Sequence, residues 1–177
     1  MESTGDNQRV LMIEMATEVH RELVWLLIDR CRTALLEQGI HQWDEFYPTV
    51  ETVSADIMER RLYLLTSSGM CRAVVTIDTQ CEPQYSTVLW ATPEPALLVR
   101  RLCVDPAFQG RGYANQLMDY VEAYATQHRY ASLRLDAYSG NSRALGLYQR
   151  RGYREAGHVC FPRRVLPFIC FELGLEH

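Results

Sequence analysis

The sequence predicts a single α+β domain in which helices are interspersed among strands that pair mainly antiparallel. Its length of 177 residues is typical of one domain. Hydrophobic residues make up 47% of the chain and charged residues 23%, as in an ordinary soluble globular protein. Short apolar runs bounded by turn residues alternate with longer segments of helical periodicity, and this order indicates the α+β class.

A strand and a long helix are expected at the start of the chain. Residues 10–15 are apolar enough for the strand. Thr17 is a suitable N-cap for the helix, and Gly39 is a suitable residue to end it. The mostly apolar stripe of this helix is expected to contain Val19, Leu23, Leu26, Leu27, Arg30, Cys31, Ala34 and Leu35.

The remaining elements follow from turn residues and periodicity. Ser54 is expected to cap a short helix that runs through Met58 and Glu59. Strands at 61–66 and 71–78 should pair around the turn Ser67-Ser68-Gly69. Further along we expect strands at 97–104 and 132–137, helices at 112–128 and 142–151, and a final hairpin of 159–161 and 165–173 about Pro162-Arg163-Arg164.

The basic residues exclude several classes of enzyme. All 18 are arginine, and the chain has no lysine. A phosphate-binding loop of the Walker A type, a protein kinase and a Schiff-base enzyme each need a lysine amine. The formal net charge is −4, so we expect no nucleic-acid partner and no binding to an anionic membrane.

A cytoplasmic location is expected, and no metal site. The first nine residues are polar and lack the pattern of a signal peptide, and no apolar run is long enough to span a membrane. The six cysteines are scattered and are expected to be reduced, mostly as small core residues. There is no H-E-x-x-H motif and no Cys/His cluster. Residues 1–174 are expected to form the domain, and 175–177 resemble the start of an affinity tag.

The first segment that carries chemistry runs from Val104 to Ala114. A strand ends there, a turn containing Gly110 and Gly112 follows, and a helix begins. Backbone N–H groups at a helix N-terminus lack partners within the helix, and the aligned peptide dipoles add positive charge. A phosphate or pyrophosphate therefore fits this turn. The alternative is a plain helix start with a flexible turn.

The second segment places an amide, a phenol and a carboxylate around one helix. Asn141 and Tyr148 are seven residues apart, about 20° short of two full turns, so they share a helix face. Asp136 lies on the preceding strand, five residues before Asn141. Alternatively, Asn141 is only the helix N-cap, Tyr148 a core tyrosine and Asp136 a solvated strand charge.

Together the two segments resemble the GNAT superfamily of N-acetyltransferases, which use acetyl-CoA. The family's central signature, Gln/Arg-x-x-Gly-x-Gly/Ala after a strand ending in Val-x-Pro, is matched by Val104, Pro106, Gln109, Gly112 and Ala114. Its second signature, Asn followed seven residues later by Tyr and then Gly-Phe/Tyr, is matched by Asn141, Tyr148, Gly152 and Tyr153. The resemblance is clear over 97–157 and looser elsewhere, and it does not specify the acceptor.

This resemblance implies a mixed, mostly antiparallel seven-stranded sheet with about four helices, splayed between the strands at 97–104 and 132–137. The pantetheine arm of acetyl-CoA would lie in the wedge between these strands. Asn141 and Tyr148 would lie near the pantetheine arm. The main chain expected to bind the cofactor belongs to Leu102, Cys103 and Val104 for the pantetheine amides, and to Gln109, Gly110, Arg111, Gly112, Tyr113 and Ala114 for the pyrophosphate.

The resemblance also implies direct transfer of an acetyl group to an amine in a ternary complex. Tyr148 would protonate or stabilise the departing thiolate, and Asp136 is the leading general base, with Glu94, Asp44 and Glu45 as alternatives. The acceptor would be a small-molecule amine or a protein N-terminus, and a homodimer is left open. A non-catalytic acyl-CoA-binding or regulatory module on the same fold is the alternative function, and a structural domain that matches by chance is a third.

The segment from Ile40 to Pro48 is expected on the acceptor side. Trp43, Phe46 and Tyr47 are interleaved with Asp44 and Glu45, which would suit an aromatic, acidic pocket for a cation. The alternative, given equal weight, is that the aromatic side chains only anchor the segment to the core.

Overall fold

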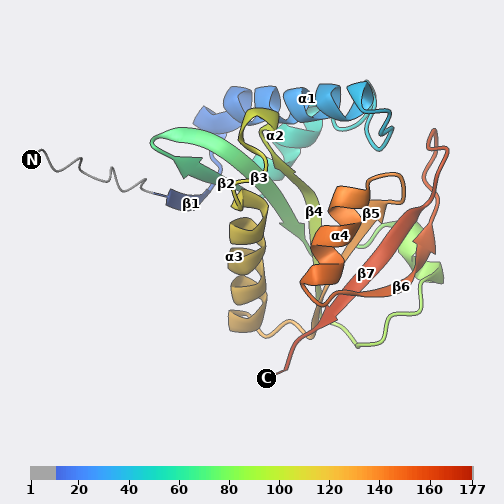
Figure 1. Ribbon diagram of the computed structural model, residues 1–177. Coiled ribbons are helices and arrows are strands. Elements are labelled where there is room, and N and C mark those ends of the chain that lie inside the picture. The colour runs from blue at the N-terminus through green and yellow to red at the C-terminus, as the bar shows by residue number, and fades with distance from the viewer. Residues whose placement is uncertain (1–10, 177) are drawn as a thin grey trace, which may run out of the picture.

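A computed structural model describes residues 11–176. Within this range seven strands form one sheet in the order β1-β2-β3-β4-β5-β7-β6, with four α-helices packed on it (Figure 1). Every pair of neighbouring strands is antiparallel except β4 and β5. The expected fold class, a mostly antiparallel seven-stranded sheet with about four helices, is therefore confirmed.

The strands are β1 (Leu11–Met15), β2 (Leu62–Ser67), β3 (Met70–Asp78), β4 (Ala96–Val104), β5 (Ser132–Tyr138), β6 (Arg154–Val159) and β7 (Phe168–Gly174). The helices are α1 (Arg21–Glu37), α2 (Val50–Met58), α3 (Tyr113–Gln127) and α4 (Ser142–Arg150), with short 3₁₀ turns η1 (Glu18–His20), η2 (Pro83–Thr87) and η3 (Pro106–Phe108). None of the helices between residues 11 and 176 is long and apolar enough to cross a membrane.

The helices cover both faces of the sheet because the strands in its centre are apolar on both sides. In β2, Tyr63 and Leu65 pack in the cluster that contains α3 and α4, whereas Leu62 and Leu64 pack against α1 and α2. This alternation follows from the period of two along a strand. The two layers of helices place α4 beside the middle of the sheet, where β4 and β5 meet (Figure 1).

The parallel strands β4 and β5 separate after a short common stretch. They pair only from Ala96 to Leu98 on β4, opposite 132–134 on β5. Beyond that point β4 stays paired with β3 up to Val104, while β5 follows β7. The sheet therefore opens into a wedge, as expected for the strands at 97–104 and 132–137.

A β-bulge in β4 lies where the two strands separate. The register between β3 and β4 shifts between Val74 and Thr76, and Arg101 has a φ of +50°. Arg101 donates from Nε and Nη2 to the two carboxylate oxygens of Asp56 on α2, each at 2.8 Å. Thr76 donates to the same carboxylate at 3.0 Å. Asp56 is only 1% exposed, so a buried ion pair between α2 and β4 holds the bulge.

The apolar stripe expected for the first helix is partly wrong. The side chains of α1 that are buried are those of Val24, Leu27, Ile28 and Cys31, whereas Val19, Leu23 and Leu26 are exposed. Thr17 caps the 3₁₀ turn η1 rather than α1. A 3₁₀ turn has three residues per turn, so it shifts the phase of the helical face relative to an α-helix counted from Thr17.

Two element boundaries also differ from the expectation. Helix α2 begins at Val50 with Thr49 as its N-cap, and Ser54 lies inside it, where its hydroxyl donates to the carbonyl of Val50. The final hairpin consists of β6 and β7, and 160–167 form the connection. Strand β6 is an edge strand with mostly exposed side chains, so it lacks the alternating hydrophobic pattern that identifies a half-buried strand.

Two cysteines and the C-terminal boundary of the domain also differ from the expectation. Cys81 and Cys160 are exposed, so the description of the cysteines as mostly core residues does not hold for them. The N–H of Leu175 donates to the carbonyl of Ala131, and its side chain packs against the core, one residue past the expected domain boundary. Val10, expected to begin the first strand, the polar segment 1–9 and His177 lie outside the described residues.

Candidate active site

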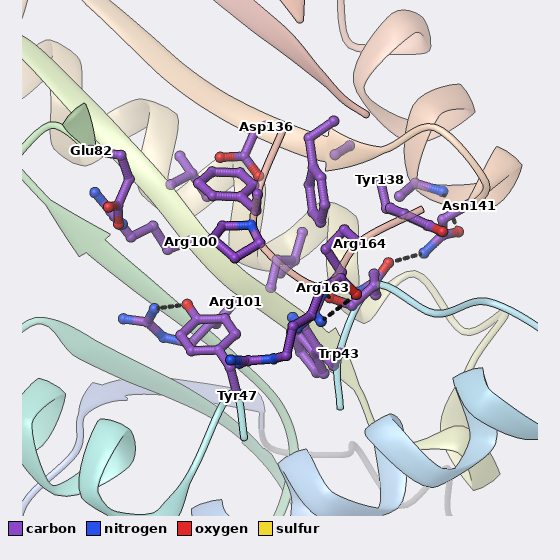
Figure 2. A pocket seen from close by; sticks show the side chains of 18 of the residues that line it. Trp43, Tyr47, Glu82, Arg100, Arg101, Asp136, Tyr138, Asn141, Arg163 and Arg164 are labelled. Carbon is purple, nitrogen blue, oxygen red and sulfur yellow. Dashed lines mark hydrogen bonds and ion pairs between the residues drawn. The ribbon is translucent and has the colours of Figure 1, made fainter. Parts of the chain in front are cut away.

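The wedge between β4 and β5 contains a cavity of about 430 Å³. Its walls come from β4, β5, the start of α4, the connection between α1 and α2, and the loop between β6 and β7 (Figure 2). Four of the predicted site residues line it, namely Leu102, Asp136, Asn141 and Tyr148. Residue 102 on β4 and residues 136–148 on β5 and α4 thus form parts of one site.

Asp136 lies on β5 at the base of the wedge, where it lines the cavity. Its carboxylate accepts a short hydrogen bond from the hydroxyl of Tyr85 on η2. Burial raises the pKa of Asp136, and this effect outweighs the hydrogen bond from Tyr85 and the positive charge of Arg100. Asp136 is therefore not the solvated strand charge of the alternative interpretation, but a buried carboxylate with increased proton affinity.

Tyr148 lies on α4, on the side that faces the sheet. Its ring packs against those of Tyr153 and Phe171, with centroids 5.7 and 5.9 Å away, and the residue also lines the cavity. Within residues 11–176 its hydroxyl has no hydrogen-bond partner. Burial, and then the negative charge of Asp136, raise the pKa of the phenol. Tyr148 is thus both a core residue and a proton-bearing group beside the cavity.

Asn141 caps helix α4, as the alternative interpretation expected. Its Oδ1 accepts from the N–H of Ala144 at 3.1 Å. Its Nδ2 donates to Oε1 of Gln42 at 2.8 Å, which connects α4 to the segment between α1 and α2. Because the residue also lines the cavity, capping and a place in the site are compatible.

The turn before α3 has the features of a phosphate cradle. Gly110 and Gly112 have φ values of +77° and +83°, in the left-handed region that favours glycine, and a Cβ at either position would meet no atom within 4 Å. Helix α3 has no side-chain cap and no acidic residue in its first turn. Its N-terminal N–H groups and the positive end of its dipole are therefore open to an anion.

The side chains around this turn add positive charge. The guanidinium of Arg111 lies 4.9 Å from the ring centroid of Phe108, and that of Arg72 lies 3.7 Å from it. Arg143 donates to the side chain of Gln109. The residues present therefore fit a diphosphate. The side chain of Tyr113 is buried in the core, so this residue would act through its main chain.

The edge of β4 that faces the wedge has no strand partner beyond Leu98. Leu102 lines the cavity, and Cys103 and Val104 continue the pairing with β3. The carbonyl of Val104 accepts from the thiol of Cys31 at 3.2 Å and from Nε2 of Gln109 at 3.4 Å. This edge would supply main-chain groups to an extended ligand lying in the wedge, in the manner of an added strand.

The acceptor-side segment forms an aromatic wall but not an acidic one. Trp43, Phe46 and Tyr47 line the cavity, and Trp43 also packs in the core. Asp44 does not line it, because its carboxylate accepts from Arg163 at 3.2 Å, from Arg164 at 2.6 Å and from the N–H of Phe46. Burial acts to raise the pKa of Asp44, but these hydrogen bonds outweigh it and hold the pKa well below its ordinary range.

Several cavity residues were not predicted from the sequence. Glu82 and Arg100 form an ion pair in one wall, and Arg101, Arg163 and Arg164 line other parts of it (Figure 2). The sequence signal that could have found part of this set is the pair of consecutive arginines at 100–101 inside an apolar strand, because buried arginines need acidic partners. Arg163 and Arg164 were assigned only to a turn, because nothing local shows that the loop between β6 and β7 reaches the cavity.

Comparison with known proteins agrees with this geometry. Residues 69–153 match the model of the Acetyltransferase (GNAT) family. A GNAT-family acetyltransferase from Streptococcus agalactiae superposes with a TM-score of 0.80 at 20% identity, covering 94% of this chain and 96% of the other. The ribosomal-protein-S18-alanine N-acetyltransferase from Escherichia coli superposes with a TM-score of 0.70 at 17% identity, with 95% and 96% covered. No curated protein is similar enough in sequence to count as a relative.

The family match over 69–153 identifies a GNAT acetyltransferase domain in this chain, and the splayed sheet with the cavity at the splay agrees with it. The chain is therefore an acetyltransferase.

Proposed function

We propose that this protein transfers an acetyl group from acetyl-CoA to an amine acceptor by direct attack in a ternary complex. The observation that carries this proposal is the position of Asp136 and Tyr148. The carboxylate of Asp136 on β5 has a raised pKa, and the phenol of Tyr148 on α4 has no hydrogen-bond partner within residues 11–176. Both residues line the same cavity. The negative charge of Asp136 contributes to the raised pKa of Tyr148. Two groups with such environments suit the base and acid of one reaction.

Asp136 takes the proton that the acceptor must lose. An amine in water at neutral pH is mostly an ammonium ion, and only the neutral form is a nucleophile. Because burial raises the pKa of Asp136, its carboxylate holds this proton better than an exposed aspartate would. The hydrogen bond from Tyr85 orients the carboxylate, which makes Tyr85 a positioning residue.

Tyr148 stabilises the sulfur that leaves. Acetyl-CoA, when bound, supplies the thioester carbon to which the new C–N bond forms as the C–S bond breaks. The pKa of the Tyr148 phenol lies above its ordinary value, and therefore above the value of about 8.5 for a thiol. The phenol thus keeps its proton for most of the reaction and donates a hydrogen bond as charge develops on sulfur. The acceptor nitrogen loses two protons in all, the first to Asp136 before attack and the second after the C–N bond has formed, and this second proton balances the thiol product.

The chain's own main-chain groups would hold the donor. The N–H groups between Gln109 and Ala114 bind its diphosphate, and the free edge of β4 at 102–104 binds the amide-bearing arm. The open φ-positive glycines and the uncapped start of α3 support the first contact. The missing strand partner of β4 supports the second.

Other assignments of the base are less favoured. Glu94 pairs with Arg134 and does not line the cavity, and Asp44 is held by two arginines. Glu45 is exposed and also lies outside the cavity wall. A covalent route through Cys103 has little support, because a hydrogen bond with Cys31 and burial raise the pKa of this thiol well above its ordinary value.

The test is release of CoA thiol from acetyl-CoA by the purified protein across a panel of amines. Transfer requires thiol release that depends on the acceptor and an N-acetylated product detected by mass. A non-catalytic acyl-CoA-binding module would bind CoA and release no thiol with any amine. Loss of rate in Asp136→Asn and Tyr148→Phe, with CoA binding retained, would separate these residues from donor binding.

A further inference from the structure

Two loops meet over the cavity and are joined by Arg164. This residue belongs to the loop between β6 and β7, at 160–167, and its side chain is 6% exposed. It donates to Asp44 at 2.6 Å and to the carbonyl of Gln42 at 2.8 Å, both in the connection between α1 and α2. A charged hydrogen bond shielded from water is stronger than an exposed one. The loop is therefore fixed in place at the cavity wall.

The neighbouring Arg163 presents the end of its guanidinium without a partner. Its Nε donates to Asp44 at 3.2 Å, and its Cζ lies 4.8 Å from the ring centroid of Phe46. Across residues 11–176, neither of its terminal nitrogens has a hydrogen-bond acceptor. Its side chain is 55% exposed, and the residue lines the cavity. Nη1 and Nη2 together form a planar fork that matches a carboxylate.

The backbone at Arg163 is unusual as well. Its φ of +61° is in the left-handed region, which non-glycine residues adopt at a cost. The adjacent Arg164 is anchored by its hydrogen bonds to Asp44 and Gln42. A strained residue in the cavity wall whose guanidinium has two terminal nitrogens without partners points to a ligand rather than to stability.

Acidic side chains lie on one wall of the cavity, and Arg163 lies on the opposite wall. Asp136 and Glu82 lie on the far wall from Tyr47 and Arg163 (Figure 2). Arg100 is paired with Glu82 and Arg101 with Asp56, whereas Arg163 and Arg164 share Asp44. The loop wall therefore carries one positive charge in excess. The phosphate cradle is separate, because no residue of 105–114 lines this cavity.

From this arrangement we propose that the acceptor carries a carboxylate in addition to its amine. The amine lies toward Asp136, the carboxylate pairs with the Nη1–Nη2 fork of Arg163, and an apolar side chain packs against Phe46 and Tyr47. The acceptor is thus an amino acid type of molecule. This inference rests on the proposed acetyl transfer, and it narrows the class of acceptor for the same site.

The experiment compares three amines that share one ring and one amino group. Phenylalanine has the carboxylate, phenylalaninamide has the neutral carbonyl of a peptide, and phenethylamine has neither. We expect kcat/KM to be highest for phenylalanine. In Arg163→Gln the value for phenylalanine should fall about 10–100-fold, as for a lost charged hydrogen-bond pair, while the values for the other two change less than about threefold.

Control variants show whether the effect comes from the two terminal nitrogens of Arg163 or only from its positive charge. Arg154→Gln removes an equal charge from the exposed edge strand β6, away from the cavity, and should leave all three values unchanged. Arg163→Lys keeps the charge without the fork and should recover only part of the preference. The phosphonate analogue of phenylalanine distinguishes the kind of anion, and a preference for it over phenylalanine would overturn the assignment of a carboxylate.

A second measurement distinguishes the two proposals. Calorimetric titration of phenylalanine and phenylalaninamide into the protein saturated with CoA measures acceptor binding without turnover. A carboxylate preference in binding that Arg163→Gln abolishes supports the inference, even if no amine releases thiol and acetyl transfer is refuted. Turnover of amines with no carboxylate preference, or with one that persists in Arg163→Gln, overturns the inference and leaves acetyl transfer standing. If the protein shows neither acceptor binding nor turnover of any amine, both proposals are overturned.

Discussion

Asp136 and Tyr148 show at the scale of single residues how burial prepares polar groups for chemistry. Each lies in the wall of one cavity, and burial is the largest cause of each raised pKa. The burial that raises the proton affinity of Asp136 also keeps the Tyr148 phenol protonated, as their proposed roles of base and acid require. A buried ionisable group costs stability, so its presence at the splay of the sheet is better explained by function than by folding.

Replacing Tyr148 by Phe should lower kcat about 10–100-fold and change KM little. The ring and its packing against Tyr153 and Phe171 remain, and only the hydroxyl that meets the developing charge on sulfur is lost. Steady-state thiol release measures both constants. Tyr153→Phe is the matched control, because that hydroxyl bonds Glu122 outside the cavity and its loss should spare kcat. A Tyr148→Phe protein that lost stability but not rate would show that Tyr148 is only a core residue.

Replacing Asp136 by Asn should have opposite effects on rate and stability. Turnover should fall more at pH 7 than at pH 9.5, because at high pH more of the acceptor is already neutral. Since the folded-state pKa of Asp136 is raised, the native state binds its proton more readily than the unfolded state, and the wild type loses stability as pH rises through that pKa.

Asn carries no such charge, so the variant should melt higher than the wild type at pH 8, and this advantage should vanish near pH 4. Melting curves and rate profiles over this range measure both effects. An unaltered rate at every pH would assign the proton transfer to water or to another carboxylate.

At the scale of elements, the bulge in β4 produces the wedge. An antiparallel strand that gains a residue bends away from its neighbours. Here the extra residue falls beside Arg101, whose guanidinium crosses to Asp56 on α2. The helix and the strand are thus linked by a buried pair just where β4 leaves β5.

Breaking this pair should be costly. In Asp56→Asn the cation of Arg101 stays buried without a countercharge, which typically lowers the free energy of unfolding by about 3–5 kcal/mol. Denaturant unfolding measures the loss. The control Asp29→Asn removes the partner of Arg32 from a helix-surface pair and should cost less than about 1 kcal/mol. Equal losses in the two variants would mean that the bulge does not depend on Asp56.

At the scale of the whole molecule, the proposed donor site would span both parts of the opened sheet. The cradle before α3 and the edge of β4 belong to one side, and β5 with α4 belongs to the other. A ligand that contacts both sides binds only the folded protein. Its binding therefore shifts the folding equilibrium by mass action.

Acetyl-CoA and CoA should each raise the melting temperature. At a ligand concentration of about 100 times Kd the stabilisation is about 2.7 kcal/mol, which corresponds to roughly 5–10 °C for a domain of this size. Gly112→Val should reduce this shift, because valine is strained at the φ of +83° and its branched side chain would fill the cradle. Gly39→Val introduces the same strain at the end of α1 and should keep the shift. An equal ligand-induced shift in both variants would rule out the cradle.

The sequence by itself was sufficient for the local features of this protein. Periodicity and turn residues located α3 and β5 to within about one residue, because amphipathic periods and glycine turns are properties of short segments. The two signatures, from Val104 to Ala114 and from Asp136 to Tyr153, identified the family, since each lies within one strand–turn–helix unit. Of the two, only the second contributes side chains to the cavity, whereas the first forms the separate turn before α3.

Only the tertiary structure determined which side chains pair in the cavity wall that we propose for the acceptor. Arg163 and Asp44 are 119 residues apart, and Arg101 and Asp56 are 45 apart. No periodicity within either segment records such pairings, because they depend on how the strands and loops pack in space. For the same reason the sequence suggested an acidic wall from Asp44 and Glu45, whereas packing paired Asp44 with two arginines and left the end of Arg163 facing the cavity.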